Sequence, residues 1–198
     1  MMSTRHNTQN TQIQGTTTRK PKNFYSREYN YYWSRKDRWG EHSFVDPNAI
    51  VEQVLFTCGN GKLLDVGCGM GLLVNTFLSR STDAYGIDIA MSPIKEANKI
   101  APNHFLNGSI FDLPFADNSF DTICSTDCLE HISEEEIPKA ISELYRVTKR
   151  FAFIKLSSAV DRDFRWHLTI RQYDWWEAKF LEAGFRLHPM LQKIFHTN

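Results

Sequence analysis

A short glycine-rich stretch carries the clearest chemical signal in the sequence. Residues 63–72 read LLDVGCGMGL, so that an apolar run containing Asp65 is followed by Gly67, Gly69 and Gly71. Glycines at this spacing indicate a tight turn whose bare backbone a ligand can approach, and the N–H groups of the following helix can bind an anionic or polar group. The pattern G-x-G-x-G differs from the dinucleotide fingerprint G-x-G-x-x-G, and it lacks the G-K-S/T of a P-loop.

A second acidic residue lies about 20 positions further on. Asp88 ends the apolar run in YGIDIA. An acidic residue at the carboxyl end of the next strand is placed to accept hydrogen bonds from ribose hydroxyls. A solvated turn aspartate is the alternative interpretation. The coincidence with the glycine loop favours the ribose role, and the two signals together predict a ligand that contains a ribose.

A histidine follows a later apolar run and is the candidate general base. Asp127, Glu130 and His131 belong to the stretch DCLEH. That stretch is expected at the carboxyl edge of a sheet, where α/β proteins place their sites. His131 there can accept a proton from a substrate hydroxyl. The alternative is a structural histidine that opens the next helix, and Glu130 is expected to be a polar tether.

The elements that position these residues alternate between strands and helices. Short apolar runs predict strands that are buried on both faces, and the segments between them show helical spacing. The predicted strands cover residues 62–66, 83–89, 120–125 and 151–156, and the predicted helices cover residues 71–80, 92–100, 138–150 and 174–184. This alternation predicts an α/β fold with three layers and a mostly parallel sheet.

Composition narrows the class of protein. The chain has 198 residues, with 23 Lys plus Arg balanced by 23 Asp plus Glu. A zero net charge argues against binding to nucleic acid or anionic lipid mainly through bulk charge. The mean hydropathy is −0.43 and no apolar run approaches the length of a membrane span. The four cysteines form no C-x-x-C pair and no secretory signal precedes them, which predicts a cytoplasmic protein without a disulfide framework or zinc site.

The chain is expected to have three regions. Residues 1–23 are polar and basic and predict a disordered arm. Residues 24–61 begin with the aromatic and basic segment FYSREYNYYWSRKDRW, which predicts a helical cap over a core or cleft. Stacking of nucleic-acid bases on these rings is the alternative. Residues 62–198 form the predicted ligand-binding core.

Taken together, these motifs resemble class I S-adenosylmethionine-dependent methyltransferases. The matching segments are LLDVGCGMG, YGIDIA, GSIFDLPFADNSFDTICSTDCLEHI and ELYRVTK before FAFIKL, and they span about residues 62–155. DLPFADNSFD followed by LEHI is typical of the branch that acts on small molecules, including quinones, polyketides and sugars. The resemblance implies S-adenosylmethionine as the cofactor and a Rossmann-like sheet.

The resemblance also assigns the methionine half of the cofactor. It implies that Gly67, Gly69 and Gly71 line this half and that Asp65 orders the loop. Thr126, at the end of the run FDTICST, is expected near the cofactor's amino group.

Four further positions are implied for the adenosine half. Asp88 is expected to bond both ribose hydroxyls, with Ile89 beside the adenine. Ser109 stands where an aspartate more commonly reads the adenine, so binding is expected to weaken but not to fail. Ile110 is expected to pack against the adenine ring.

The same stretch contains a candidate metal motif. Asp127, Glu130 and His131 are spaced as acidic-x-x-E-H, which is similar to the E-x-x-E-H cluster of some magnesium-dependent O-methyltransferases, with Asp in place of the first Glu. LEHI also occurs in many relatives that use no metal. The sequence-based prediction is therefore base catalysis by His131 without a metal ion.

The pocket for the methyl acceptor is expected to be formed by the aromatic segment and the residues after the last predicted strand. Arg162, Arg165, His167 and Arg171 gather there with Trp166, and several arginines can clamp a phosphate or carboxylate. The alternative is a solvated loop whose arginines pair with nearby acidic residues.

The resemblance also leaves one element of the fold without a matching segment. Related folds close with an antiparallel hairpin, for which the residues after Gly184 are too few. We therefore expect an incomplete hairpin and a sheet edge that a partner domain or a second copy covers. The predicted function is methyl transfer to a small-molecule hydroxyl. The alternatives are an RNA or protein methyltransferase and a catalytically silent cofactor-binding domain.

Overall fold

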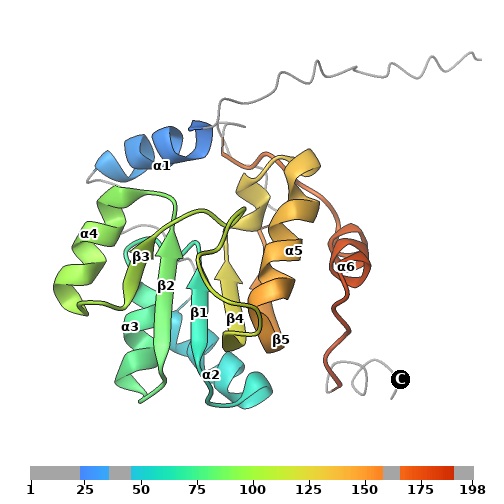
Figure 1. Ribbon diagram of the computed structural model, residues 1–198, viewed down its shortest axis with the longest axis horizontal. Coiled ribbons are helices and arrows are strands. Elements are labelled where there is room, and N and C mark those ends of the chain that lie inside the picture. The colour runs from blue at the N-terminus through green and yellow to red at the C-terminus, as the bar shows by residue number, and fades with distance from the viewer. Residues whose placement is uncertain (1–22, 36–45, 158–165, 190–198) are drawn as a thin grey trace, which may run out of the picture.

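The fold is built on a parallel sheet of five strands (Figure 1). The computed structural model describes residues 23–35, 46–157 and 166–189. The strands are β1 Leu63–Val66, β2 Ala84–Asp88, β3 Phe105–Asn107, β4 Phe120–Thr126 and β5 Thr148–Lys155. Their order is β3-β2-β1-β4-β5, and every neighbouring pair is parallel. The predicted α/β fold is confirmed, and all four predicted strands are present.

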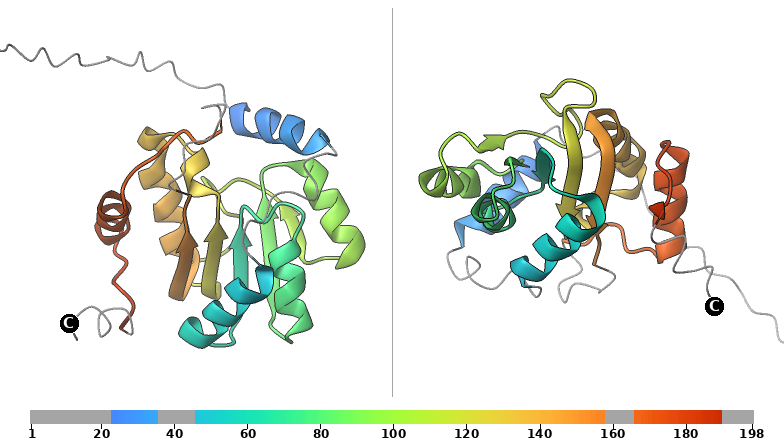
Figure 2. Two further views of the ribbon diagram at one scale, coloured as in Figure 1. Left: turned by 180° about the vertical axis from the view of Figure 1, so that it is seen from behind. Right: turned by 90° about the horizontal axis from the view of Figure 1, so that it is seen from below.

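Helices cover both faces of this sheet (Figure 2). They are α1 Phe24–Ser34, α2 Pro47–Cys58, α3 Leu72–Ser79, α4 Met91–Ile100, α5 Ile137–Val147 and α6 Tyr173–Glu182. One apolar core joins α2, α3 and α4 to the sheet, and the other joins α5 and α6 to its opposite face. Adjacent residues of β1 face opposite cores, Leu63 one and Leu64 the other, because side chains alternate along a strand.

The region expected as a cap divides into two parts. Helix α1 crosses the carboxyl ends of the strands (Figure 1), where Tyr25 is 8% exposed and its hydroxyl donates to Glu136 Oε2 at 2.5 Å. Burial and that carboxylate raise the pKa of Tyr25 to about 12. Helix α2 instead belongs to a helical layer, with Val51 and Val54 fully buried against the sheet. The predicted arm, residues 1–23, lies outside the described residues except for its last residue.

Several element boundaries differ from the prediction. The predicted helix over residues 138–150 ends at Val147, and Thr148 already pairs with Phe120 in the sheet. Helix α6 begins at Tyr173, one residue before the predicted start at Asp174. It ends at Glu182, before the predicted end at Gly184, whose φ of 109° is a conformation that glycine adopts without strain. Strand β3 was not predicted, since three residues are too few to show a period.

Strand β5 forms one edge of the sheet. Within the described residues no strand follows it, and residues 185–188 are irregular. No strand of the expected incomplete hairpin is therefore formed in this part of the chain. Among the helices described, none is long and apolar enough to cross a membrane.

The DLPF motif is held in place by a motif from α5. Arg146 donates to the carbonyl oxygens of Leu113 at 2.8 Å and Phe115 at 2.7 Å. Glu143 accepts two bonds from that guanidinium and a third from the N–H of Leu113. The ELYRV sequence therefore fixes the loop that precedes β4, which is a structural role.

We expect Arg146→Lys to lower the free energy of unfolding by about 1–3 kcal/mol, because an ammonium cannot bridge two carbonyls and a carboxylate in one plane. Urea titration measures the change. The guanidinium also lowers the pKa of Glu143, so this stabilisation is present above the ordinary carboxyl pKa and is lost as the pH falls through the lowered value. Lys149→Gln is the control, because Lys149 is 60% exposed in its pair with Asp121, and we expect a change within about 0.5 kcal/mol. Equal effects of the two substitutions would contradict the structural role.

Candidate functional site

A large cavity opens at the carboxyl ends of β1, β2 and β4. Its volume is about 840 Å³. The wall brings together most of the residues that the sequence singled out, namely Asp65, Gly67, Gly69, Asp88, Ile89, Ile110, Thr126 and His131. It also contains residues that the sequence did not single out individually, including Tyr29, Trp33 and Cys128. The aromatic segment was a signal for the first two, whereas nothing in the sequence indicated the cysteine.

The glycine loop turns through left-handed backbone. Gly67 has φ 83° and Gly69 has φ 51°, and the N–H groups of Gly67 and Cys68 both bond the carbonyl of Ile87. A side chain at Gly69 would meet the Trp33 ring at 2.8 Å, so the indole of α1 lies directly on the loop. Gly71 lies outside the described cavity wall, and a Cβ at this position would lie 2.3 Å from ring atoms of Phe105. Its absent side chain serves the packing of α3 against the sheet.

Asp88 links the loop to the next strand. Its carboxylate accepts the Gly69 N–H at 2.9 Å and the Ala90 N–H at 2.8 Å. Burial raises its pKa, although the two backbone bonds act in the opposite direction. Asp65 is 3% exposed in the same wall, and burial together with Asp88 raises its pKa to about 7. Two carboxyl groups therefore lie in the wall beside the glycine loop, and burial opposes the ionisation of both.

The segment expected to hold an adenine is only partly in the wall. Ile89, Gly108 and Ile110 line the cavity. Ser109 lies outside the described cavity wall, and its hydroxyl accepts the N–H of Phe111 at 3.2 Å. The structure therefore places Ser109 in a turn, where it caps the backbone.

Residues 64–154 match the family model for a methyltransferase domain. This segment is a class I methyltransferase domain. It contains the glycine loop, Asp88 and His131, and its family implies S-adenosylmethionine as the cofactor.

The relatives of this methyltransferase domain act on different kinds of acceptor. Ajmaline N-methyltransferase of Rauvolfia serpentina is 33% identical over 52% of this chain and 37% of its own. Demethylmenaquinone methyltransferase of Renibacterium salmoninarum is 33% identical over 44% of this chain and 37% of its own. The chain thus spans well under half the length of these two relatives. A solved SAM-dependent methyltransferase of Thermotoga maritima has the same fold, with a TM-score of 0.60, 17% identity and coverage of 80% of each chain.

The residues of the methyltransferase domain fit this cofactor. A carboxylate has about four lone-pair sites, and the two backbone bonds of Asp88 leave sites for ribose hydroxyls. Bare backbone at Gly67 and Gly69 and the acidic pair Asp65 and Asp88 suit a ligand that carries a positive sulfonium and an ammonium group.

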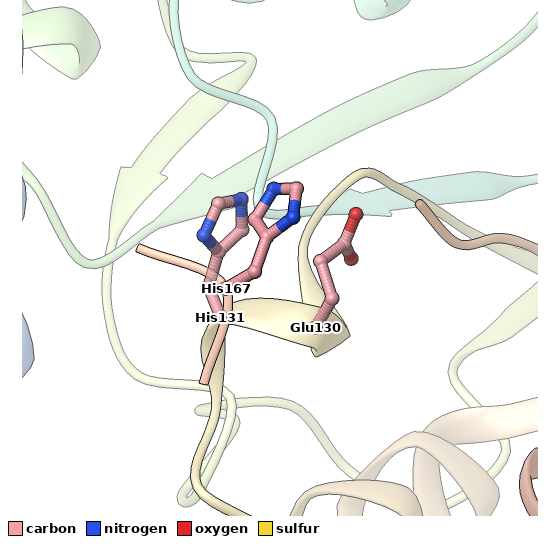
Figure 3. Close-up of side chains that lie close together, drawn as sticks. All are labelled: Glu130, His131 and His167. Atoms are coloured by element: carbon pink, nitrogen blue, oxygen red, sulfur yellow. The ribbon is translucent and has the colours of Figure 1, made fainter. Parts of the chain in front are cut away.

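A cluster with two histidines lies in and beside the cavity wall. Glu130 and His131 belong to the short turn Leu129–His131 after β4, and His167 follows β5 (Figure 3). Ligand-type atoms of the three side chains all lie within 4.8 Å of one another. The Nδ1 of His131 lies 2.9 Å from the carbonyl oxygen of Trp166. A carbonyl only accepts, so Nδ1 carries the hydrogen and Nε2 carries the lone pair of the neutral ring.

Asp127 lies apart from this cluster, although the metal motif included it. Its carboxylate is exposed and pairs with Lys155 at 2.6 Å. His167 takes the third position beside Glu130 and His131, because the segment after β5 folds back over the turn after β4.

Of the arginines expected to clamp an acceptor, only Arg171 lies in the part of the chain that the structure describes. Arg171 is half-exposed and pairs with Glu134 at 2.6 Å, and Arg162 and Arg165 lie outside the described residues. The alternative of surface ion pairs holds for Arg171, with Glu134 as the partner.

A smaller pocket adjoins the cavity on the side of α1. It has a volume of about 220 Å³ and is lined by Phe24, Glu28, Tyr29, His131, Trp166 and Leu168. Tyr29 and His131 belong to both spaces. The ring of Tyr29 contacts those of His131 and Trp166, with centroids 5.6 and 5.8 Å apart. A mainly aromatic space, which Glu28 also lines, therefore borders the candidate base.

Proposed function

We propose that the chain transfers the methyl group of S-adenosylmethionine to a hydroxyl oxygen of a small-molecule acceptor. Bound S-adenosylmethionine supplies an electrophilic methyl group on its sulfonium. The protein's task is then to bind the cofactor, align the acceptor and exclude water. The proposal rests on one observation: Tyr29 and His131 line both the large cavity and the smaller pocket beside α1.

Cofactor binding is proposed for the large cavity. In this assignment Asp88 accepts hydrogen bonds from the ribose hydroxyls, and Ile89 and Ile110 border the adenine. Gly67 and Gly69 present bare backbone to the methionine half. Thr126 lies in the same wall and is proposed to contact the amino group.

Acceptor binding is proposed for the smaller, aromatic pocket. Rings of Phe24, Tyr29 and Trp166 line it, which suits an apolar or aromatic acceptor. His131 lies where this pocket meets the large cavity, and the lone pair on its Nε2 can accept the hydroxyl proton.

This assignment favours a small acceptor over RNA. Tyr25 is buried and Tyr29 and Tyr32 contact Trp166, so these rings of α1 pack against the domain and are not displayed for base stacking. The net charge of zero also gives no bulk attraction to phosphates. Four free thiols suit the reducing cytoplasm that we propose as the compartment.

We expect His131→Asn to lower the methyl-transfer rate by about 10²–10⁴-fold. Asparagine can still donate to the Trp166 carbonyl but has no counterpart of Nε2. The affinity for S-adenosylmethionine is expected to stay within about threefold, because His131 is not assigned to the cofactor's ribose or loop contacts. The assay follows labelled methyl groups from the cofactor into a panel of phenols, sugars and amines, and calorimetry measures cofactor affinity.

His104→Asn is the matched control. His104 makes the same kind of bond through Nδ1, to the carbonyl of Ala84 at 2.8 Å, but lies outside both described cavity walls. Its substitution is expected to leave turnover unchanged. Methyl groups recovered on nitrogen would overturn the hydroxyl assignment, and full turnover in His131→Asn would overturn the role of His131.

A further inference from the structure

The cluster of Glu130, His131 and His167 has the composition of a metal site. One ligand-type atom from each side chain lies within 4.8 Å of the others. Figure 3 shows the three side chains next to one another, two from the turn after β4 and one from the segment after β5. Two imidazoles and one carboxylate hold Zn²⁺ and other divalent transition ions, and they leave coordination positions for a further ligand.

The carboxylate of Glu130 provides an independent observation. The residue is 0% exposed. Its Oε1 accepts the N–H of Ser157 at 2.8 Å, whereas Oε2 is buried without a hydrogen-bond partner among the described residues. The N–H of Ser157 and the nearby His167 compensate part of the charge of this buried carboxylate, and Oε2 is the atom left without a hydrogen bond in the described part of the chain. A cation bound to Oε2 would compensate the rest.

Backbone hydrogen bonds hold the two histidine-bearing segments together. The carbonyl of Glu130 accepts the N–H groups of Leu168 at 2.8 Å and Thr169 at 3.0 Å. The Nδ1 of His131 donates to the carbonyl of Trp166 at 2.9 Å, which leaves Nε2 in the form that ligates metals. The donors are thus positioned by the fold, and an ion need not order them.

We propose that Glu130, His131 and His167 bind one divalent transition-metal ion, Zn²⁺ or Mn²⁺, at the wall of the methyl-transfer cavity. Both histidines line the large cavity, so the ion borders the space assigned to the reaction. This site differs from the sequence motif, because Asp127 is bound to Lys155 and His167 replaces it.

The role of the ion rests on the proposed function. An acceptor hydroxyl bound to the ion would have a lowered pKa and would release its proton to water as the acceptor binds, before methyl transfer. The oxygen then bonds to the methyl carbon while the carbon–sulfur bond breaks and sulfur keeps the electron pair. With the ion bound, Nε2 of His131 is a ligand and no longer the proton acceptor.

The test is a calorimetric titration of the full chain with Zn²⁺ and Mn²⁺ after removal of metals by a chelator, in the absence of cofactor and acceptor. We expect one ion per chain and weaker binding of Mg²⁺, which prefers oxygen ligands. Glu130→Gln and His167→Asn are each expected to weaken binding by about tenfold or more. Asp127→Asn is the matched control, and its affinity is expected to stay within about twofold.

Circular dichroism establishes that each variant is folded. Should Glu130→Gln fail to fold, His131→Asn and His167→Asn test the same site. A folded native chain that binds no ion overturns the proposal, as does binding that is unchanged in folded His131→Asn and His167→Asn. Since the titration contains no methyl donor, failure to find methyl transfer leaves a positive metal result standing. If methyl transfer proceeds in chelator and the chain binds no metal, the metal proposal fails. The proposed function then stands, with His131 as the proton acceptor.

Discussion

Asp88→Ala is expected to weaken S-adenosylmethionine binding by about 10²–10⁴-fold, which corresponds to two hydrogen bonds to a charged acceptor of about 1.5–3 kcal/mol each. The same carboxylate accepts the N–H groups of Gly69 and Ala90, so the substitution also releases the glycine loop. Both effects reduce affinity. Calorimetric titration with the cofactor measures the change.

Asp83→Ala is the matched control for this substitution. Asp83 is exposed and precedes the first residue of β2, the strand that Asp88 ends. We expect its cofactor affinity to match that of the native chain. An affinity for Asp88→Ala within a few-fold of the native value would remove Asp88 from the cofactor site.

Gly67→Ala is expected to lower the free energy of unfolding by about 2–5 kcal/mol. The resemblance assigns Gly67 to the methionine half of the cofactor, but the first obstacle to a side chain is the protein itself. A Cβ at this position would lie 2.5 Å from the Sγ and 2.8 Å from the Cβ of Cys128. The φ of 83° adds the cost of a left-handed backbone for a residue with a side chain. Urea unfolding followed by circular dichroism measures the loss.

Gly59→Ala separates the two costs. Gly59 has a similar φ of 79°, and nothing lies within 4 Å of the position its Cβ would take. We expect a loss of about 1–3 kcal/mol there, from the backbone alone, because residues with a side chain rarely adopt the φ of 79° and ψ of 177° found at Gly59. If Gly67→Ala were no more destabilising than Gly59→Ala, the contact with Cys128 would not restrict the loop.

Local sequence patterns predicted the parallel sheet, the glycine turn and the position of Asp88. Each is a local pattern: a buried apolar run, a turn that requires φ above zero, and an acidic residue at a strand end. Parallel neighbours bring the carboxyl ends of β1 and β2 to the same edge, so the loop and Asp88 had to meet. Local spacing was sufficient for these features because the chain segments involved are short and regular.

Packing between distant segments determines which side chains surround that edge. His167 joins His131 only because the segment after β5 returns to bond the carbonyl of Glu130. Gly71 packs against Phe105 from another strand, although its spacing matched that of the loop glycines. Such neighbours depend on loop paths and on packing between distant elements, and neither leaves a period in the sequence. The glycine loop could therefore be found from its own residues, whereas the histidine and carboxylate cluster required the fold.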